Sequence, residues 1–177
     1  MIDMTQTLPK ELQSTAVVRF QDCDPFQHLN NARYLDYFLN AREDQLANFY
    51  GFNIFEHTQT EKQAWVVTRT HIAYLAPAHV MESILIQTRL IHMSDTLIVV
   101  EGIMFDQHMK RAKAVVWMEF AYVSLVTGRP AKHADELMQL FAQVIANDAS
   151  YEPDGFNSRA ESIKRQYRKQ PVEVVEQ

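Results

Sequence analysis

A single long amphipathic segment in the first third of the chain constrains the fold more than any other feature. Its apolar side chains fall near one face at helical spacing: Phe38, Leu39, Leu46, Phe49 and Tyr50. Asn30 or Asn31 can cap the start of this helix, and Gly51 can end it in a left-handed conformation. A helix of about 20 residues is about 30 Å long, so its apolar face needs a broad surface to pack against.

Four strand-like segments after the helix can provide this surface. They are rich in Val, Ile, Thr and aromatic residues and cover residues 64–75, 83–93, 96–106 and 112–126. Short polar connections between the last three predict two hairpins, and therefore antiparallel pairing. Residues 15–20 are expected to form one further strand before the helix. This order predicts an α+β fold in which a curved antiparallel sheet of about five strands wraps around one long central helix.

The length of the chain indicates one domain with short extensions. Its 177 residues can bury one complete core and are too few for two. We expect residues 1–14 to form a loose lead-in, residues 15–150 to form the main domain, and residues 151–177 to form a helical extension.

Two further helices are predicted after the last strand. The first has apolar residues at helical spacing: Leu137, Leu140, Phe141, Val144 and Ile145. Ser158 and Glu161 have the spacing of a capping box before a mostly polar helix that Pro171 would end. Because this last helix has Ile163 and Tyr167 as its same-face apolar pair, we expect it to be weakly held or to dock on a partner.

Composition and charge exclude several classes of protein. Apolar residues make up 47% of the chain and charged residues 22%, and no apolar run is long enough to span a bilayer. The first residues lack a basic segment followed by an apolar one, so we expect a cytoplasmic protein without a membrane span. Cys23 is the only cysteine, which excludes an internal disulfide. The histidine spacing and the net charge of −5 lead us to predict no metal, no cofactor and no nucleic-acid partner.

The segment at residues 22–34 carries most of the functional argument. It ends a strand-like run with acidic and amide groups and then begins the long helix. A carboxylate beside a helix N-terminus can act on water or on a carbonyl group. The unpaired backbone N–H groups of the first helical turn can hold a developing oxyanion. We therefore expect the active site here.

The same residues resemble a known family. Residues 24–35, followed by Ala41 and Arg42, closely resemble the start of hotdog-fold acyl-CoA thioesterases. Residues 20–25 look like the 4-hydroxybenzoyl-CoA thioesterase branch, and the His-x-Asn-Asn-Ala-Arg-Tyr run looks like the long-chain acyl-CoA thioesterase branch. The resemblance covers roughly residues 15–127, and its order of elements agrees with the order expected from the patterns above.

The resemblance implies roles for two residues. Asp24, the second acid of Asp-x-Asp, matches the family's catalytic carboxylate, which is a nucleophile in some members and a general base in others. Asn31 matches the backbone N–H donor that polarises the thioester carbonyl. Family members are homodimers or homotetramers with active sites at the subunit interface, and their substrate is an acyl-CoA, with an acyl-carrier protein as a possible alternative. From the residues alone, Asp24 can also be a turn cap, and Asp22 is the other candidate acid with a structural role favoured.

Three neighbouring residues are candidates for substrate binding. His28 can orient water or substrate, or it can be a loop histidine hydrogen-bonded to backbone. Asn30 suits a helix cap as well as it suits a binding site. Tyr34 lies one turn into the helix, where core packing is the alternative interpretation.

The chain departs from the family pattern at two places. Met81 and Glu82 occupy positions where many relatives have a glycine and an aspartate, so the geometry of that loop is open. The histidine of one branch falls at the position of Asn31, three residues after His28.

Two other functions fit parts of the sequence. A hotdog hydratase or dehydratase could use Asp24 and His28 as its catalytic pair, although the glycine and proline of the usual hydratase pattern are missing. A noncatalytic acyl-CoA binding module would not need the acid. Basic residues that could meet the phosphates of CoA are Arg89, Arg111, Lys113, Arg129 and Lys132. The retained Asp24 and the lack of an additional domain favour an enzyme.

Overall fold

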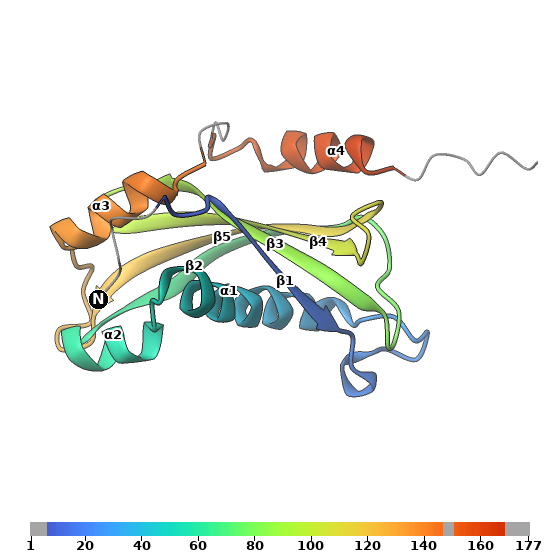
Figure 1. Cartoon of the computed structure of the whole chain (residues 1–177), viewed down its shortest axis with the longest axis horizontal. Helices are drawn as coiled ribbons and strands as arrows, with labels where there is room; N and C mark the ends of the chain where they lie inside the picture. Colours follow the sequence, from blue (N-terminus) through green and yellow to red (C-terminus); the bar gives the residue numbers. More distant parts are fainter. Residues whose placement is uncertain (1–6, 147–150, 169–177) are drawn as a thin grey trace, which may run out of the picture.

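The computed structural model describes residues 7–146 and 151–168, and within them a five-stranded antiparallel sheet wraps around a central helix (Figure 1). The strand order is β1-β3-β4-β5-β2. The strands are β1 (Glu11–Val17), β2 (Gln63–Tyr74), β3 (Ser83–Met93), β4 (Leu97–Asp106) and β5 (Ala112–Ser124). The helices are α1 (Tyr34–Tyr50), α2 (Ile54–Glu61), α3 (Asp135–Val144) and α4 (Phe156–Gln166). No helix in the described ranges is long and apolar enough to cross a membrane. The predicted α+β architecture and its hairpins are confirmed.

Helix α1 covers one face of the sheet because its apolar side chains form a continuous side. Tyr34 and Phe38 are buried in one core cluster with Ile86 and Val100 of the sheet. Removing this apolar surface from water is the main favourable contribution to folding. Gly51 ends α1 with a φ of 62°, the left-handed conformation that the sequence predicts.

Gly102 in β4 lets α1 approach the sheet closely. A Cβ atom at this position would lie 2.7 Å from Cδ1 of Phe38 and 2.9 Å from Cγ1 of Val116. Phe38 is fully buried, so its ring has little room to move away. The ring of Phe38 therefore occupies the space that a side chain at position 102 would need.

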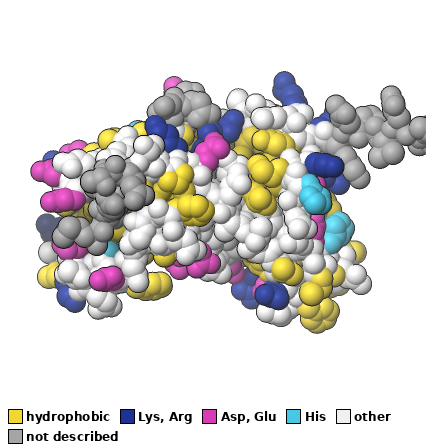
Figure 2. Space-filling model, in the orientation of Figure 1, with side chains coloured by type: hydrophobic (Ala, Val, Ile, Leu, Met, Phe, Trp, Pro, Cys, Tyr) yellow, Lys and Arg dark blue, Asp and Glu magenta, His cyan; other side chains and the backbone are white. Residues whose placement is uncertain are grey.

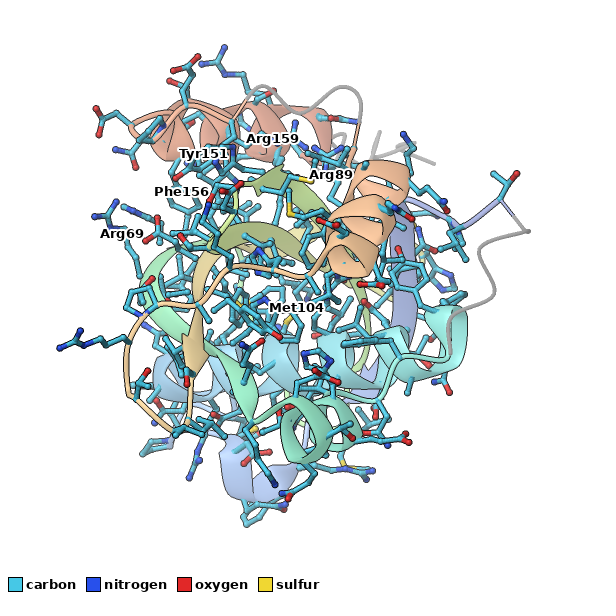
Figure 3. All side chains as sticks on the ribbon, turned by 90° about the vertical axis from the view of Figure 1, so that its left-hand side faces the viewer. Arg69, Arg89, Met104, Tyr151, Phe156 and Arg159 are labelled. Carbon is cyan, nitrogen blue, oxygen red and sulfur yellow. The ribbon has the colours of Figure 1, made fainter. Side chains whose placement is uncertain are left out.

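Helix α4 covers the opposite face of the sheet (Figure 1). Phe156, Ala160 and Ile163 are buried in a second cluster that includes Trp117. Figure 3 shows Phe156 and Arg159 beside α4, and Met104 across the sheet from them. We expected this helix to be weakly held or to dock on a partner; instead, its apolar side packs on its own sheet.

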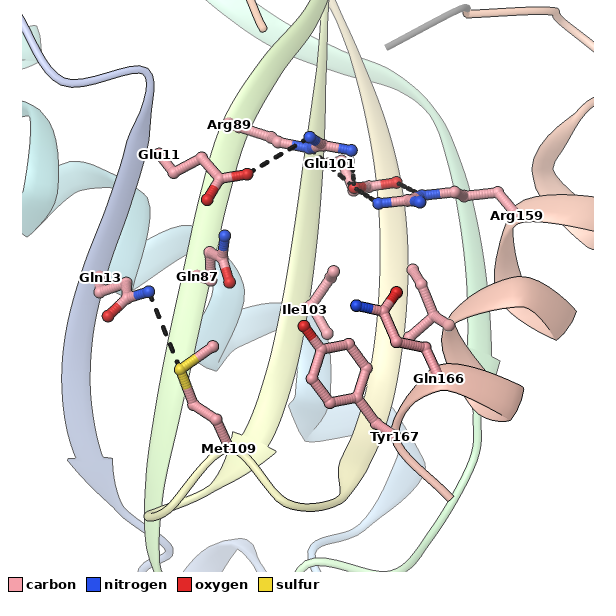
Figure 4. Close-up of a pocket in the computed structure, with 11 residues that line it drawn as sticks. Glu11, Gln13, Gln87, Arg89, Glu101, Ile103, Met109, Arg159, Gln166 and Tyr167 are labelled. Carbon is pink, nitrogen blue, oxygen red and sulfur yellow. Dashed lines mark hydrogen bonds and ion pairs between the residues drawn. The ribbon is translucent and has the colours of Figure 1, made fainter. Parts of the chain in front are cut away.

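A buried carboxylate, Glu101, links α4 to the sheet (Figure 4). Its oxygens accept hydrogen bonds from Nε of Arg89, from Nε1 of Trp117 and from two nitrogens of Arg159, all at 2.9 Å. Burial alone would raise the pKa of Glu101, but the hydrogen bonds from Arg159 and Trp117 and the two arginine charges hold it below its ordinary value. The cluster is a charged connection between the sheet and the C-terminal extension.

The first strand begins earlier than expected. It spans Glu11–Val17 rather than residues 15–20, so residues 11–14 of the expected lead-in belong to the sheet. Leu12 is fully buried while its neighbours Glu11 and Gln13 are exposed. This alternation was hidden because β1 is an edge strand whose outward side chains are polar.

The starts of two helices also differ from expectation. Ser158 lies inside α4 and does not cap it. Gly155 is the N-cap residue and has no side chain that could make a cap, and Phe156 in the first turn packs on Trp117. Pro171 lies outside the described residues. Helix α2 was not expected, and it begins where the side chain of Asn53 accepts two backbone N–H groups.

We expect Gly102→Ala to lower the free energy of unfolding by about 1–3 kcal/mol, because the added methyl group overpacks the contact with Phe38. Urea unfolding measures this loss. Gly128→Ala is no suitable control, because Gly128 has a φ of 68° and an alanine there would strain the backbone. Ala47→Gly, on the exposed side of α1, measures the cost of an ordinary exchange between alanine and glycine. A cost no larger than that of Ala47→Gly would contradict the close-packing explanation.

We expect Glu101→Gln to lower the free energy of unfolding by about 3–5 kcal/mol at neutral pH, because it removes the buried negative charge that lies between Arg89 and Arg159. Arg89 keeps its ion pair with Glu11. The pKa of Glu101 is lowered by folding, so its stabilising effect is present above the ordinary value of 4.5 and is lost as the pH falls through the lower folded-state value. The difference between the variant and the wild type should therefore shrink in acid. Glu161→Gln, an exposed carboxylate on α4, is the matched control and should change stability by less than about 0.5 kcal/mol.

Candidate active site

The loop between β1 and α1 folds back on itself. The backbone N–H of Asp24 donates to the carbonyl of His28 at 2.8 Å, and the N–H of Asn30 donates to the carbonyl of Asp22 at 2.9 Å. Cys23 and Leu29 form an isolated antiparallel bridge between these bonds. The loop therefore behaves as a short hairpin that brings the Asp-x-Asp acids to the start of α1.

One oxygen of Asp24 holds the loop and the other is free. Oδ1 accepts the backbone N–H of Phe26 at 2.9 Å and that of His28 at 3.0 Å. Oδ2 has no hydrogen-bond donor within residues 7–146 and 151–168, and the side chain is half-buried. The turn-cap interpretation of Asp24 is thus correct for one oxygen, and the second oxygen is available for chemistry.

The start of the helix leaves one backbone donor free. The side-chain oxygen of Asn30 accepts the N–H of Ala32 at 3.0 Å, and the backbone carbonyl of Asn30 accepts the N–H of Arg33 at 2.8 Å. Between them, the N–H of Asn31 has no acceptor in the described part of the chain, while its carbonyl accepts the hydroxyl of Tyr74 at 2.9 Å. A free N–H at a helix N-terminus is a site for negative charge.

His28 and Tyr34 have structural contacts. The ring of His28 meets the ring of His79 edge to face, with centroids 4.9 Å apart. Tyr34 is buried, its oxygen accepts the N–H of Ala78 at 3.2 Å, and burial raises its pKa. Core packing is therefore the observed role of Tyr34, and its predicted contact with substrate stays a prediction, as do those of His28 and Asn30.

The side chain of Asp22 contacts residues at the start of α1. It lies in a short 3-10 helix, Phe20–Asp22, and not on the extended strand that the sequence indicates. Its Oδ2 accepts the hydroxyl of Tyr37 at 2.9 Å, and its Oδ1 lies 4.0 Å from Nε of Arg33. These contacts agree with the structural role that was favoured for Asp22.

A second loop, residues 75–82, supports the first. Its carbonyl at Ala78 accepts the N–H of Leu29 at 2.8 Å. The buried ammonium of Lys113 contacts Glu82 at 2.7 Å and donates to the carbonyl of Pro77 at 2.9 Å. Met81 has a φ of 62°, a left-handed conformation that suits the glycine of the family pattern which Met81 replaces.

Sequence reasoning missed the Lys113–Glu82 ion pair, and it assigned two buried cations to phosphate binding. Glu82 and Lys113 lie 31 positions apart, so no local pattern joins them. Lys113 and Arg89 were candidates for binding the phosphates of CoA, but both are buried and paired with carboxylates. The contact of Tyr74 with Asn31 was also missed, although Tyr74 lies near the end of a predicted strand.

Comparison with known proteins decides the family. Residues 18–141 match the thioesterase-like superfamily. The chain belongs to the thioesterase-like superfamily. The predicted enzyme class, a thioester hydrolase, is confirmed by this membership.

Individual relatives agree with the superfamily match. Long-chain acyl-CoA thioesterase FadM from Escherichia coli (strain K12) is 25% identical over 134 residues, which is 76% of this chain and 99% of that protein. The crystal structure of YbaW, a probable thioesterase from Escherichia coli, has a TM-score of 0.66 at 25% identity and covers 76% of this chain and 99% of its own. The structure of a 1,4-dihydroxy-2-naphthoyl-CoA thioesterase from Synechocystis has a TM-score of 0.67 at 13% identity, and the match covers 80% of this chain and 99% of that one. At this low identity, the likeness shows a shared hotdog fold and nothing further.

We expect Asn30→Ala to lower the free energy of unfolding of this thioesterase by about 1 kcal/mol, because the cap of the helix start is lost. It should also lower turnover, because the free N–H of Asn31 lies in the turn that this cap holds. Asn53→Ala removes an equivalent cap from α2 and is the matched control. Urea unfolding and thioester turnover should show similar destabilisation in both variants and a loss of turnover in Asn30→Ala alone. Equal turnover in the two variants would separate the helix start from catalysis.

Proposed function

We propose that this protein hydrolyses acyl-CoA thioesters to a free acid and CoA, with Asp24 and the N–H of Asn31 as its catalytic groups. The observation that carries the proposal is the loop in which one carboxylate oxygen and one helix N-terminal donor are both free. Membership of the thioesterase-like superfamily and the similarity to a long-chain acyl-CoA thioesterase support the reaction class and the substrate class.

The N–H of Asn31 would hold the thioester carbonyl oxygen. Attack on the carbonyl carbon places negative charge on this oxygen, and a preorganised donor at that point is worth about 3–4 kcal/mol of barrier. The peptide group that carries this donor is held by the bond from the N–H of Arg33 to the backbone carbonyl of Asn30. The next peptide group is held by the side chain of Asn30 and by the hydroxyl of Tyr74. Such a donor needs little reorganisation during the reaction.

Asp24 would act by one of two routes. As a general base it removes a proton from water while the water oxygen attacks the carbonyl carbon; the C–S bond then breaks, and the CoA sulfur takes up a proton. As a nucleophile its oxygen attacks directly, CoA leaves, and water hydrolyses the resulting anhydride. Both routes need an ionised carboxylate with a free oxygen.

The hydratase alternative lacks support from the site. Asp24 and His28 contact each other through Oδ1 and backbone N–H, and the His28 ring meets His79. No hydrogen bond joins the two side chains within the described residues. The geometry therefore favours the thioesterase.

A second copy of the chain would complete the site. Strand β2 is at one edge of the sheet, and its exposed side chains include Val66, Val67 and Tyr74. Phe26, beside Asp24, is 79% exposed. Figure 2 shows hydrophobic side chains at the end of the molecule that carries this loop. Unpaired edges and exposed apolar groups are features of association surfaces, so we propose a homodimer, with a tetramer as its possible higher assembly.

The groove beside the first strand does not suit the CoA phosphates. It has a volume of about 700 Å³ between β1 and α1. Four acidic residues line it, Asp22, Asp36, Glu43 and Asp44, and Arg19 is the one cation among its lining residues. Like charges repel, so we place CoA on the other side of the loop, towards Tyr74 and the second copy.

We expect Asp24→Asn to reduce kcat at least ~100-fold on the acyl-CoA that wild type hydrolyses best. The asparagine oxygen can still accept the N–H groups of Phe26 and His28, so the loop should keep its shape. Free-thiol release from short, medium, long and aromatic acyl-CoAs measures turnover.

Asp44→Asn, an exposed carboxylate of α1, is the matched control and should keep full activity. No turnover by wild type on the whole panel would contradict the proposed substrate class. Full turnover by a folded Asp24→Asn variant would remove Asp24 from the mechanism.

A further inference from the structure

A small cavity lies near the C-terminal end of α1, away from the Asp24 loop. Its volume is about 70 Å³. Apolar and aromatic side chains of α1, β2, β4, β5 and α3 dominate its walls, including Leu46, Trp65, Val100, Phe120, Leu140 and Phe141. Arg42 is the only charged residue among its lining residues. An apolar cavity with one charged wall is suited to an apolar ligand that carries the opposite charge.

Arg42 has no anionic partner. Arg42 is 9% exposed, and its Nη1 donates to Oγ1 of Thr88 at 3.1 Å. No carboxylate of the described residues lies within ion-pair distance of its guanidinium group. Burial lowers the pKa of Arg42 to about 10, so the group is still a cation at neutral pH.

The hydrogen-bond network around Arg42 is closed without neutralising it. The hydroxyl of Thr88 donates to Oε1 of Gln45, and Nε2 of Gln45 donates to Oγ of Ser14 and to the carbonyl of Ile86. Among the described residues, no buried side-chain nitrogen is both sealed from solvent and without a partner. The remaining guanidinium nitrogens of Arg42 are therefore not completely sealed from solvent, and Arg42 is one of the residues that line the cavity.

We propose that this cavity binds the carboxylate end of an aliphatic chain. A carboxylate can accept two parallel hydrogen bonds from a guanidinium group, and the surrounding apolar walls exclude water from the pair. An unpaired buried cation is unfavourable, so a ligand that neutralises it gains affinity. The cavity has room for about five water-sized groups, which suits a carboxylate and the adjoining carbons rather than a whole chain.

Two sources can supply this carboxylate. One is the distal carboxylate of an acyl-CoA whose thioester lies at Asn31, and this source rests on the proposed function. Arg42 follows Asn31 by eleven residues, so the two are about 16 Å apart along the helix axis, within the reach of a long chain. The other source is a free fatty acid that binds independently of turnover.

The first experiment measures binding without turnover. Isothermal titration calorimetry below the critical micelle concentration compares dodecanoate, dodecanol and dodecylamine on wild type, Arg42→Met and Arg165→Met. We expect wild type to bind dodecanoate at least ~10-fold more tightly than dodecanol, and dodecylamine most weakly. Arg42→Met should bind both acid and alcohol with similar affinity, because methionine keeps the apolar wall. Arg165, an exposed cation of α4, provides the control that should behave as wild type.

A variant that fills the cavity provides a separate test. Leu137→Phe, from the α3 wall, should weaken dodecanoate binding while leaving Arg42 in place. Equal affinity of wild type for dodecanoate and dodecanol would overturn the proposal. So would an acid preference that survives in Arg42→Met.

The second experiment distinguishes the sources. Turnover of dodecanoyl-CoA is compared with that of its ω-carboxy analogue. A lower KM for the analogue in wild type, lost in Arg42→Met, supports the substrate's distal carboxylate. Equal KM values, together with specific dodecanoate binding, support a separate fatty acid. Absence of turnover would contradict the proposed function and leave the binding result intact, so the two failures are distinguishable.

Discussion

The close approach of α1 to the sheet is the contact on which the rest of the structure depends. Phe38 occupies the space that a side chain at position 102 would need, and this lets the helix lie against β4 and β5. The depth of α1 then determines where its two ends lie. At the N-terminal end the helix meets the Asp24 loop, and at the C-terminal end it forms one wall of the cavity that contains Arg42.

Each functional region of this thioesterase is held in place by hydrogen bonds or ion pairs. Asp24 uses one oxygen to close its loop, and the Lys113–Glu82 pair holds the neighbouring loop against it. Exceptions to this pairing are the free oxygen of Asp24, the N–H of Asn31 and part of the Arg42 guanidinium group. Buried or preorganised polar groups that lack partners are costly, and they are found where a protein binds or transforms a ligand.

Elements with strong local patterns were predictable, and elements defined by packing were not. The period of α1, the left-handed Gly51 and the β-rich segments depend on residues a few positions apart. Strand β1 was placed too late because an edge strand carries polar residues on its outer side, and α4 was taken as weakly held because its contacts are on a distant sheet. At the site, Asp24 and Asn31 came from a contiguous motif, whereas Tyr74, Glu82 and Lys113 came from other parts of the chain.

The sequence by itself determined the class of fold, the loop that carries the acid, and the superfamily, because short-range spacing and a contiguous motif encode all three. Only the tertiary structure decided which charges are neutralised. Glu101 is paired with Arg89 and Arg159, whereas Arg42 donates to the hydroxyl of Thr88 and has no carboxylate within ion-pair distance among the described residues. The physical reason is that charge pairing and burial depend on residues brought together across the sheet, and neither can be inferred from neighbours along the chain.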